Sequence, residues 1–125
     1  MNPFQDQANF MEACGQSVGK CNPDQFLLYK RLIGEEVDEL FEAIDAIDRT
    51  EIFDALLDII VVCIGAGHSM GFPMEAGWRA VVESNLRKVD PETGKVMRRD
   101  DGKILKPEGW KPPTEKLARL IGVQP

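Results

Sequence analysis

The 125-residue sequence has little cysteine and almost no histidine, and both shortages exclude classes of site. Its three cysteines, an odd number, show no C-x-x-C spacing, so we expect neither a disulfide framework nor a structural zinc site. The single histidine, His68, leaves little basis for Ser-His-Asp catalysis and is expected to be structural or exposed. Unpaired cysteines are typical of a reducing compartment, so we expect an intracellular protein.

The sequence also lacks a long apolar run and a cationic leader. Its longest apolar stretch, Ile59 to Ala66, is far shorter than the roughly 18 to 20 residues that span a bilayer, so no membrane partner is expected. The first nine residues contain Asp6 and no basic residue followed by an apolar run, which argues against a secretory signal. We therefore expect a soluble protein.

Positive charge is scarce as well, and it is unevenly distributed. A formal net charge of -6 argues against nonspecific binding to a nucleic-acid polymer, which needs excess cations to neutralise phosphates. Residues 35–58 carry ten acidic residues and one basic residue, whereas residues 87–106 carry seven basic and four acidic residues. An acidic middle is thus followed by a basic C-terminal part.

The spacing of apolar residues predicts four helices followed by an irregular tail. We place these helices at residues 5–18, 24–47, 51–68 and 74–87. Asn22 is expected to cap the second helix, with Pro23 at its first helical position. Thr50 is expected to cap the third helix. Turn sequences at 90–94 and 100–102 predict a β-hairpin. Four prolines beyond residue 106 predict an extended or loosely packed tail, with one final helical turn at 115–121.

These elements predict one all-α domain over residues 1–125, with a helical core at 24–88 and a basic hairpin and proline-rich tail at 89–125. The predicted architecture is a four-helix bundle. From Leu56 to Ile64 the third helix is apolar almost all round, more than a small monomer can bury. We therefore expect oligomerisation to complete the bundle.

Two acidic pairs lie on successive helices. Glu36 and Glu39, and likewise Glu51 and Asp54, are about 60° apart around a helix, so each pair could share one cation. Asp58 shares the arc of the second pair. All-oxygen sites of this kind suit Mg²⁺ or Mn²⁺. The alternative is that these acids are simply the solvated faces of amphipathic helices.

Two features weigh against that alternative without removing it. Glu36 lies within about 60° of Ile33 and Leu40, at the boundary of the apolar stripe of its helix. The predicted third helix, residues 51–68, contains no lysine or arginine that could pair with its acids. Buried carboxylates must be paired, protonated or bound to metal, so a cation site is the stronger interpretation.

The motifs E-E-x-x-E at 35–39 and E-x-x-D at 51–54 resemble those of a known superfamily. It is the all-α nucleoside triphosphate pyrophosphohydrolases, which include MazG-like proteins, dimeric dUTPases and phosphoribosyl-ATP pyrophosphohydrolase. The segments that also resemble small bacterial and phage MazG-like proteins are residues 31–34, 54–58, 84–88, 101–103 and 109–113. The resemblance extends over roughly residues 24 to 114.

The resemblance implies a MazG-like fold and the cleavage of a nucleoside or deoxynucleoside triphosphate to the monophosphate and pyrophosphate. A purine such as dGTP or dATP is favoured, in a homodimer or a tetramer of two dimers, in the cytoplasm of a bacterium or a phage-infected host. Four carboxylates would ligate Mg²⁺ or Mn²⁺: Glu36, Glu39, Glu51 and Asp54. Glu35 would orient or deprotonate the attacking water, and Asp58 would support the ligands.

The basic C-terminal part then offers groups for the nucleotide. The candidates for contacts to phosphate or sugar are Asn85, Lys88, Lys103 and Lys106. A solvated tail is the alternative for the lysines. Trp78 and Trp110 are candidates for stacking on a base, although packing in the core or the tail explains them as well.

Two other functions remain open from the sequence. The chain could be a non-catalytic helical module for interaction or regulation, with its acids as surface charge. It could also be a nucleotidase that acts on di- or monophosphates. Calorimetric titration with Mg²⁺ tests the first alternative, and release of orthophosphate in place of pyrophosphate identifies the second.

Overall fold

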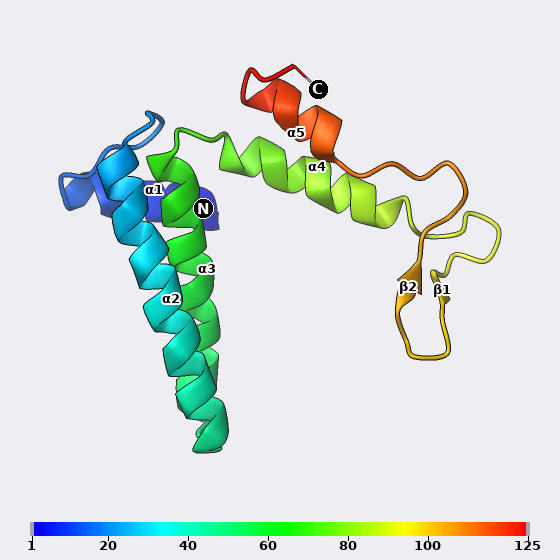
Figure 1. Cartoon of the computed structure of the whole chain (residues 1–125), viewed down its shortest axis with the longest axis horizontal. Helices are drawn as coiled ribbons and strands as arrows, with labels where there is room; N and C mark the ends of the chain where they lie inside the picture. The colour runs from blue at the N-terminus through cyan, green and yellow to red at the C-terminus, as the bar shows by residue number, and fades with distance from the viewer. Residues whose placement is uncertain (1, 125) are drawn as a thin grey trace. The chain divides into compact units, whose positions relative to one another are not determined.

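A computed structural model describes residues 2–124 (Figure 1). They form five helices and one two-stranded antiparallel sheet, so the prediction of a mainly helical chain with a hairpin is confirmed. Two compact units divide the chain, the first ending at Met74 and the second beginning at Glu75. The prediction of a single domain over residues 1–125 stays a prediction.

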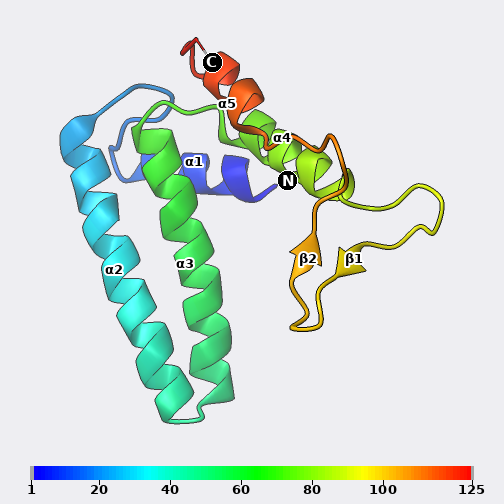
Figure 2. The ribbon, with the colours of Figure 1, turned by 45° about the vertical axis from the view of Figure 1, so that its right-hand side comes forward.

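The first unit is built from three helices. They are α1 (Pro3–Ala13), α2 (Pro23–Asp45) and α3 (Arg49–Ser69). The long helices α2 and α3 run antiparallel and lie side by side in both ribbon views (Figures 1 and 2), while α1 packs against α3. The predicted first helix, residues 5–18, is therefore placed too late, because the chain leaves the helical conformation after Ala13 and continues as a loop.

Side-chain caps determine where α2 and α3 begin. Asn22 caps α2 as predicted, and its Oδ1 accepts a hydrogen bond from the backbone N–H three residues later at 3.2 Å. The prediction that Thr50 caps α3 is wrong. Asp48 is the cap, with its Oδ1 3.1 Å from the nitrogen of Glu51, and the helix already begins at Arg49. The carboxylate of Asp48 thus satisfies one of the free N–H groups in the first turn of the helix.

The end of α2 also differs from the prediction. The helix stops at Asp45, and Ile47 adopts the left-handed conformation with φ 51°. This turn lets the nitrogen of Asp48 bond to the carbonyl of Ala43 at 3.0 Å, which closes the helix end. Two apolar residues at this end of the helix, Ile44 and Ile47, are 47% and 82% exposed, so the packed part of α2 ends before them.

The core of the first unit lies where the three helices meet. Its buried members are Met11, Tyr29, Val62 and Ala66. The absence of a side chain at Gly65 admits the Tyr29 ring, since a Cβ there would lie 2.7 Å from its Cζ. The Tyr29 hydroxyl donates to Gln16 Oε1 at 2.6 Å, which fixes the ring from its other end.

Polar contacts tie α1 and the loop after it to the end of α3. Nε2 of buried His68 lies 2.8 Å from the carbonyl oxygen of Phe4, so the histidine is structural, one of its two predicted roles. Gln25 donates to the hydroxyl of Ser69 and to the carbonyl of Ser17, both at 2.8 Å. These contacts lie at the end of the α2–α3 pair where α2 begins and α3 ends. The opposite end, beside the loop that joins the two helices, has fewer partners.

The second unit contains the remaining elements. They are α4 (Met74–Leu86, whose first residue belongs to the first unit), β1 (Met97–Arg98), β2 (Ile104–Leu105) and α5 (Thr114–Leu120). Strands β1 and β2 pair around the predicted turn, with Met97 opposite Leu105. The final helical turn predicted at 115–121 is confirmed as α5, which begins one residue earlier and returns to α4. An ion pair of 2.8 Å between Lys116 and Glu83 joins these two helices.

Candidate functional site

The candidate site of the first unit is a group of four carboxylates on facing stretches of α2 and α3. Glu36 and Glu39 lie one turn apart on α2, and Asp54 and Asp58 lie one turn apart on α3. Because the two helices are antiparallel and joined by a short loop, these turns come to similar heights along the pair. The charges of Glu39 and Asp54 act on the pKa values of both Glu36 and Asp58, which places the four side chains close together.

Glu36 is the most constrained of these carboxylates. Its Oε2 atom is buried and makes no hydrogen bond to any described residue. Burial raises the pKa of Glu36 first, followed by the negative charges of Glu39 and Asp58. Its ionised form is therefore poorly compensated by the protein itself. A buried polar atom without a partner is rare in proteins, and here it faces other acids.

Asp58 shows the same behaviour from the opposite helix. Burial raises its pKa first, followed by the charge of Asp54 and a hydrogen bond with it, and then by the charge of Glu39. Within residues 2–124, no lysine or arginine makes an ion pair with any member of this carboxylate cluster, which consists of Glu36, Glu39, Asp54 and Asp58. The concentration of negative charge is thus left without a protein cation.

Glu51 and Glu35, the other two predicted acids, are placed differently. Glu51 is exposed in the first turn of α3, and it is not among the groups that shift the pKa of Glu36 or Asp58. Glu35 is exposed and forms an ion pair with Arg31, whose Nε lies 3.9 Å from its Oε1. The predicted roles of Glu51 as a ligand and of Glu35 at the attacking water stay predictions.

The donor chemistry of the cluster fits a hard cation. Carboxylate oxygens are the ligands that Mg²⁺ and Mn²⁺ prefer, and the buried Oε2 of Glu36 lacks the partner that a cation would provide. As the side chains stand, no group of three or more acidic, histidine or cysteine residues among the described residues surrounds one point closely enough to hold a metal. A cation in this position would have to draw the carboxylates together.

The predicted nucleotide-binding residues all lie in the second unit. The ammonium of Lys88 donates to Asn85 Oδ1 at 3.0 Å. The same ammonium lies 5.0 Å from the centre of the Trp110 ring, and the ammonium of Lys106 lies 4.8 Å from it. Lys103 lies in the hairpin turn, where its backbone nitrogen donates to Asp101. The structure therefore groups three of the four candidates and leaves Lys103 apart.

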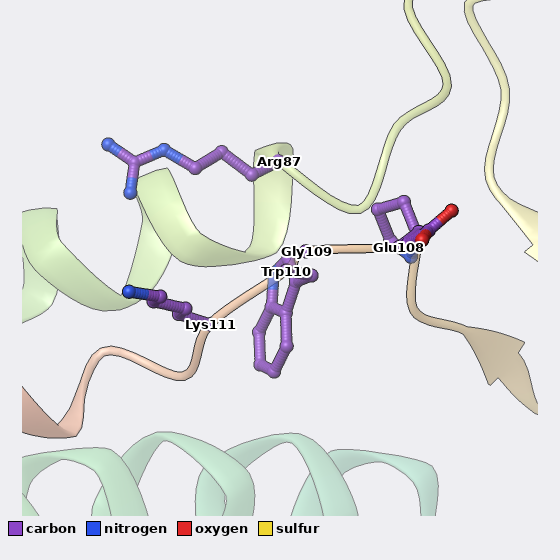
Figure 3. A pocket seen from close by; sticks show the side chains of 6 residues that line it. Arg87, Glu108, Gly109, Trp110 and Lys111 are labelled. Carbon is purple, nitrogen blue, oxygen red and sulfur yellow. The ribbon is translucent and has the colours of Figure 1, made fainter.

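A hollow of about 280 Å³ adjoins Trp110 (Figure 3). It is lined by Arg87, Pro107, Glu108, Gly109, Trp110 and Lys111. Arg87 and Lys111 are not among the ligands that the sequence predicts. Arg87 directly precedes Lys88 and Lys111 directly follows Trp110, so their position beside predicted residues is the signal that could have indicated them.

The α2–α3 pair also carries an apolar surface. Its exposed members are Phe41, Ile44, Phe53, Leu56, Leu57, Ile60 and Val61, between 40% and 65% exposed. By length and composition alone, α3 would also suit a membrane span, a test that core helices pass as well, and 44% of its most apolar window is already buried. The same helix carries Asp54 and Asp58.

Comparison with known families gives one match. Residues 19–85, just over half of the chain, match the model of the family described as "Phosphoribosyl-ATP pyrophosphohydrolase". The matched region includes all of α2 and α3 and thus the whole carboxylate cluster. No curated protein matches the chain.

Proposed function

The chain belongs to the phosphoribosyl-ATP pyrophosphohydrolase family, and from that premise we propose that it hydrolyses a purine nucleoside or deoxynucleoside triphosphate to the monophosphate and pyrophosphate. Family membership makes it a nucleotide pyrophosphohydrolase, a hydrolase that acts on acid anhydrides. We propose, beyond this, that the substrate is a purine triphosphate such as dGTP or dATP and that the chain is related more closely to MazG-like proteins.

The observation that carries the proposal is the uncompensated carboxylate cluster. Four acids on two helices, one with a buried oxygen that has no partner, are a costly arrangement in a protein without a ligand. Glu36, Glu39 and Asp54 would hold Mg²⁺ or Mn²⁺, joined by Glu51, and Asp58 would support them. A bound metal would neutralise the charge of the phosphates and make a water molecule a stronger acid.

Residues of the chain position the other reactants in this proposal. Glu35 would orient the water or accept its proton, which requires its carboxylate to leave Arg31. Asn85, Lys88, Lys103 and Lys106 would bind the phosphates or the sugar, since ammonium groups and amides are suitable donors to phosphate oxygens. Most of the catalysis then comes from positioning and from charge neutralisation, as is general for phosphoryl transfer.

We also propose that the chain works as a homodimer or a tetramer of two dimers. The exposed apolar side chains of α2 and α3 support this assembly, because such a surface on a small monomer is a typical subunit interface. We propose a location in the cytoplasm as well, which the three free cysteines support because thiols persist in a reducing compartment. A second copy would cover α3 close to the carboxylate cluster and further exclude water from it.

Pyrophosphate release tests the reaction and the substrate together. The protein is incubated with each common nucleoside and deoxynucleoside triphosphate and with phosphoribosyl-ATP, in Mg²⁺, in Mn²⁺ or in EDTA. We expect pyrophosphate, with the highest rate for a purine triphosphate, and no release in EDTA. Preference for phosphoribosyl-ATP would overturn the substrate proposal and leave the reaction class intact.

Two further outcomes would overturn more. Release of orthophosphate would identify a nucleotidase in place of a pyrophosphohydrolase. The absence of any product, together with no calorimetric binding of Mg²⁺ or Mn²⁺ near neutral pH, would favour a non-catalytic helical module. Substitution of Asp54 by Asn in the same assay connects any observed turnover to the carboxylate cluster.

A further inference from the structure

Two lysines share one aromatic ring in the second unit. The ammonium groups of Lys88 and Lys106 lie 5.0 and 4.8 Å from the centre of the Trp110 ring. They are therefore within about 10 Å of each other, which is about one Debye length at 0.1 M salt, so salt screens the repulsion between them only in part. The attraction of each cation to the face of the ring offsets part of this repulsion.

The ring itself is fixed by the backbone. Its Nε1 donates to the carbonyl of Ser84 at 2.8 Å, and the Ser84 hydroxyl donates in return to the carbonyl of Lys111 at 3.4 Å. Ser84 is only 3% exposed, so this double contact lies at a buried point of α4. Trp110 therefore contacts two lysines that are 18 residues apart in sequence, close to the end of α4.

Two further cations line the hollow that adjoins this ring. Arg87 and Lys111 line the adjoining hollow, and in Figure 3 their side chains extend in the same direction while the carboxylate of Glu108 points away. Within the described residues, none of the four cations makes an ion pair. Arg87 does contribute, after Lys116, to lowering the pKa of Glu83.

We propose that this cationic cluster, Arg87, Lys88, Lys106 and Lys111 around Trp110, binds a condensed phosphate, with Trp110 as the residue that positions its lysines. Four cations that make no ion pair give this part of a chain of net charge -6 a local positive potential, which attracts anions. A di- or triphosphate carries several charges on oxygens a few ångströms apart, which matches ammonium groups held on one ring and donors in the hollow beside it. Orthophosphate can meet only part of this set.

The identity of the anion as substrate or product rests on the proposed function, but the binding site does not. Calorimetric titration of the full chain with sodium triphosphate, in EDTA so that no turnover occurs, measures binding alone. We expect saturable binding that is weakened about tenfold or more in K88Q/K106Q, because two charge-assisted contacts are lost. Lys95→Gln removes an exposed lysine elsewhere in the same unit and should leave the affinity unchanged.

Fluorescence locates the anion. In a W78F protein, Trp110 is the remaining tryptophan, and we expect its emission to change along the same binding curve as the heat. W110L should weaken binding severalfold, and W110F, which keeps an aromatic face, should restore part of the affinity. Circular dichroism verifies that each variant retains the helical content of the parent.

Comparison of anions separates the possible sources. Triphosphate and pyrophosphate should both bind more tightly than orthophosphate or sulfate at matched ionic strength. Equal affinity of sulfate, or unchanged binding in K88Q/K106Q, would overturn the site. If triphosphate binds but no nucleotide is hydrolysed, the site stands and the proposed function fails. If K88Q/K106Q hydrolyses nucleotides with the parent's kcat and KM, the function stands and this site does not serve it.

Discussion

Glu36 on α2 and Asp58 on α3 are carboxylates on facing helices whose pKa values are both raised, first by burial and then by neighbouring acids. Asp58 is itself one of the charges that act on Glu36. Two helices thus bring like charges together in the half of their length that has few other partners. The packing that buries α2 and α3 against each other creates this cost, and a bound cation would remove it.

Glu36→Gln should therefore have opposite effects without and with metal. In EDTA we expect the substitution to raise the free energy of unfolding by about 0.2–0.5 kcal/mol for each like-charged neighbour relieved. In Mg²⁺ the variant should gain less stability than the parent, because a ligand is lost. Urea unfolding under both conditions measures this. Glu42→Gln, an exposed acid on the same helix, is the control, and a destabilised E36Q in EDTA would contradict the explanation.

The raised pKa values also predict a dependence of stability on pH. Where the folded protein binds protons more tightly than the unfolded chain, the free energy of unfolding falls as pH rises. The contribution of Glu36 and Asp58 should thus decline from the ordinary carboxylate range upward, through their raised pKa values. Urea unfolding of the metal-free parent and of E36Q/D58N across this range gives the difference. We expect the variant's advantage to grow with pH, and a constant difference would contradict the prediction.

Glu39→Gln and Asp54→Asn should each abolish turnover while leaving the fold intact. Each removes one charged ligand from the proposed metal site, and we expect kcat for pyrophosphate release to fall by about 10²-fold or more. Circular dichroism should show unchanged helical content, because both side chains are exposed. Asp45→Asn, at the end of α2 and outside the cluster, is the matched control. Full activity in both ligand variants would refute the site.

Gly65→Ala should destabilise the first unit. Its new methyl group would lie 2.7 Å from Cζ of Tyr29, a ring held by burial and by its hydrogen bond to Gln16, so we expect a loss of about 1–3 kcal/mol. Gly34→Ala is the control on α2, because no atom lies within 4 Å of its added Cβ. It should stabilise by up to about 1 kcal/mol, from helix propensity. Thermal unfolding of both variants decides, and equal effects would contradict the packing argument.

Ile60→Glu should separate the proposed subunits. Ile60 is 52% exposed on α3, and a charge buried in an apolar interface without a partner is costly. We expect light scattering after size-exclusion chromatography to show a dimer or tetramer for the parent and a smaller species for the variant. Phe10→Glu, on α1 and 62% exposed, tests whether any added charge has this effect. A monomeric parent would refute the proposed assembly.

The local elements of this protein follow from its sequence. Asn22-Pro23 marks the start of α2 because a side-chain cap and a fixed proline φ act within one turn. Asp100 to Gly102 predicts the hairpin for the same local reason. The acidic motifs also predict that α2 and α3 carry the site, since helical periodicity places Glu36 beside Glu39 and Asp54 beside Asp58.

Tertiary structure decided which of these groups meet. Periodicity places Glu51 and Asp58 on one arc of α3, but only the packing of α2 against α3 shows that Asp58 acts on Glu36 and that Glu51 does not. The left-handed conformation of Ile47 is likewise set by the closure of the loop between α2 and α3 and not by the type of its side chain. Lys88 and Lys106 meet on Trp110 because the tail returns to Ser84. Contacts between residues far apart in the chain depend on how faces pack, which no local pattern encodes.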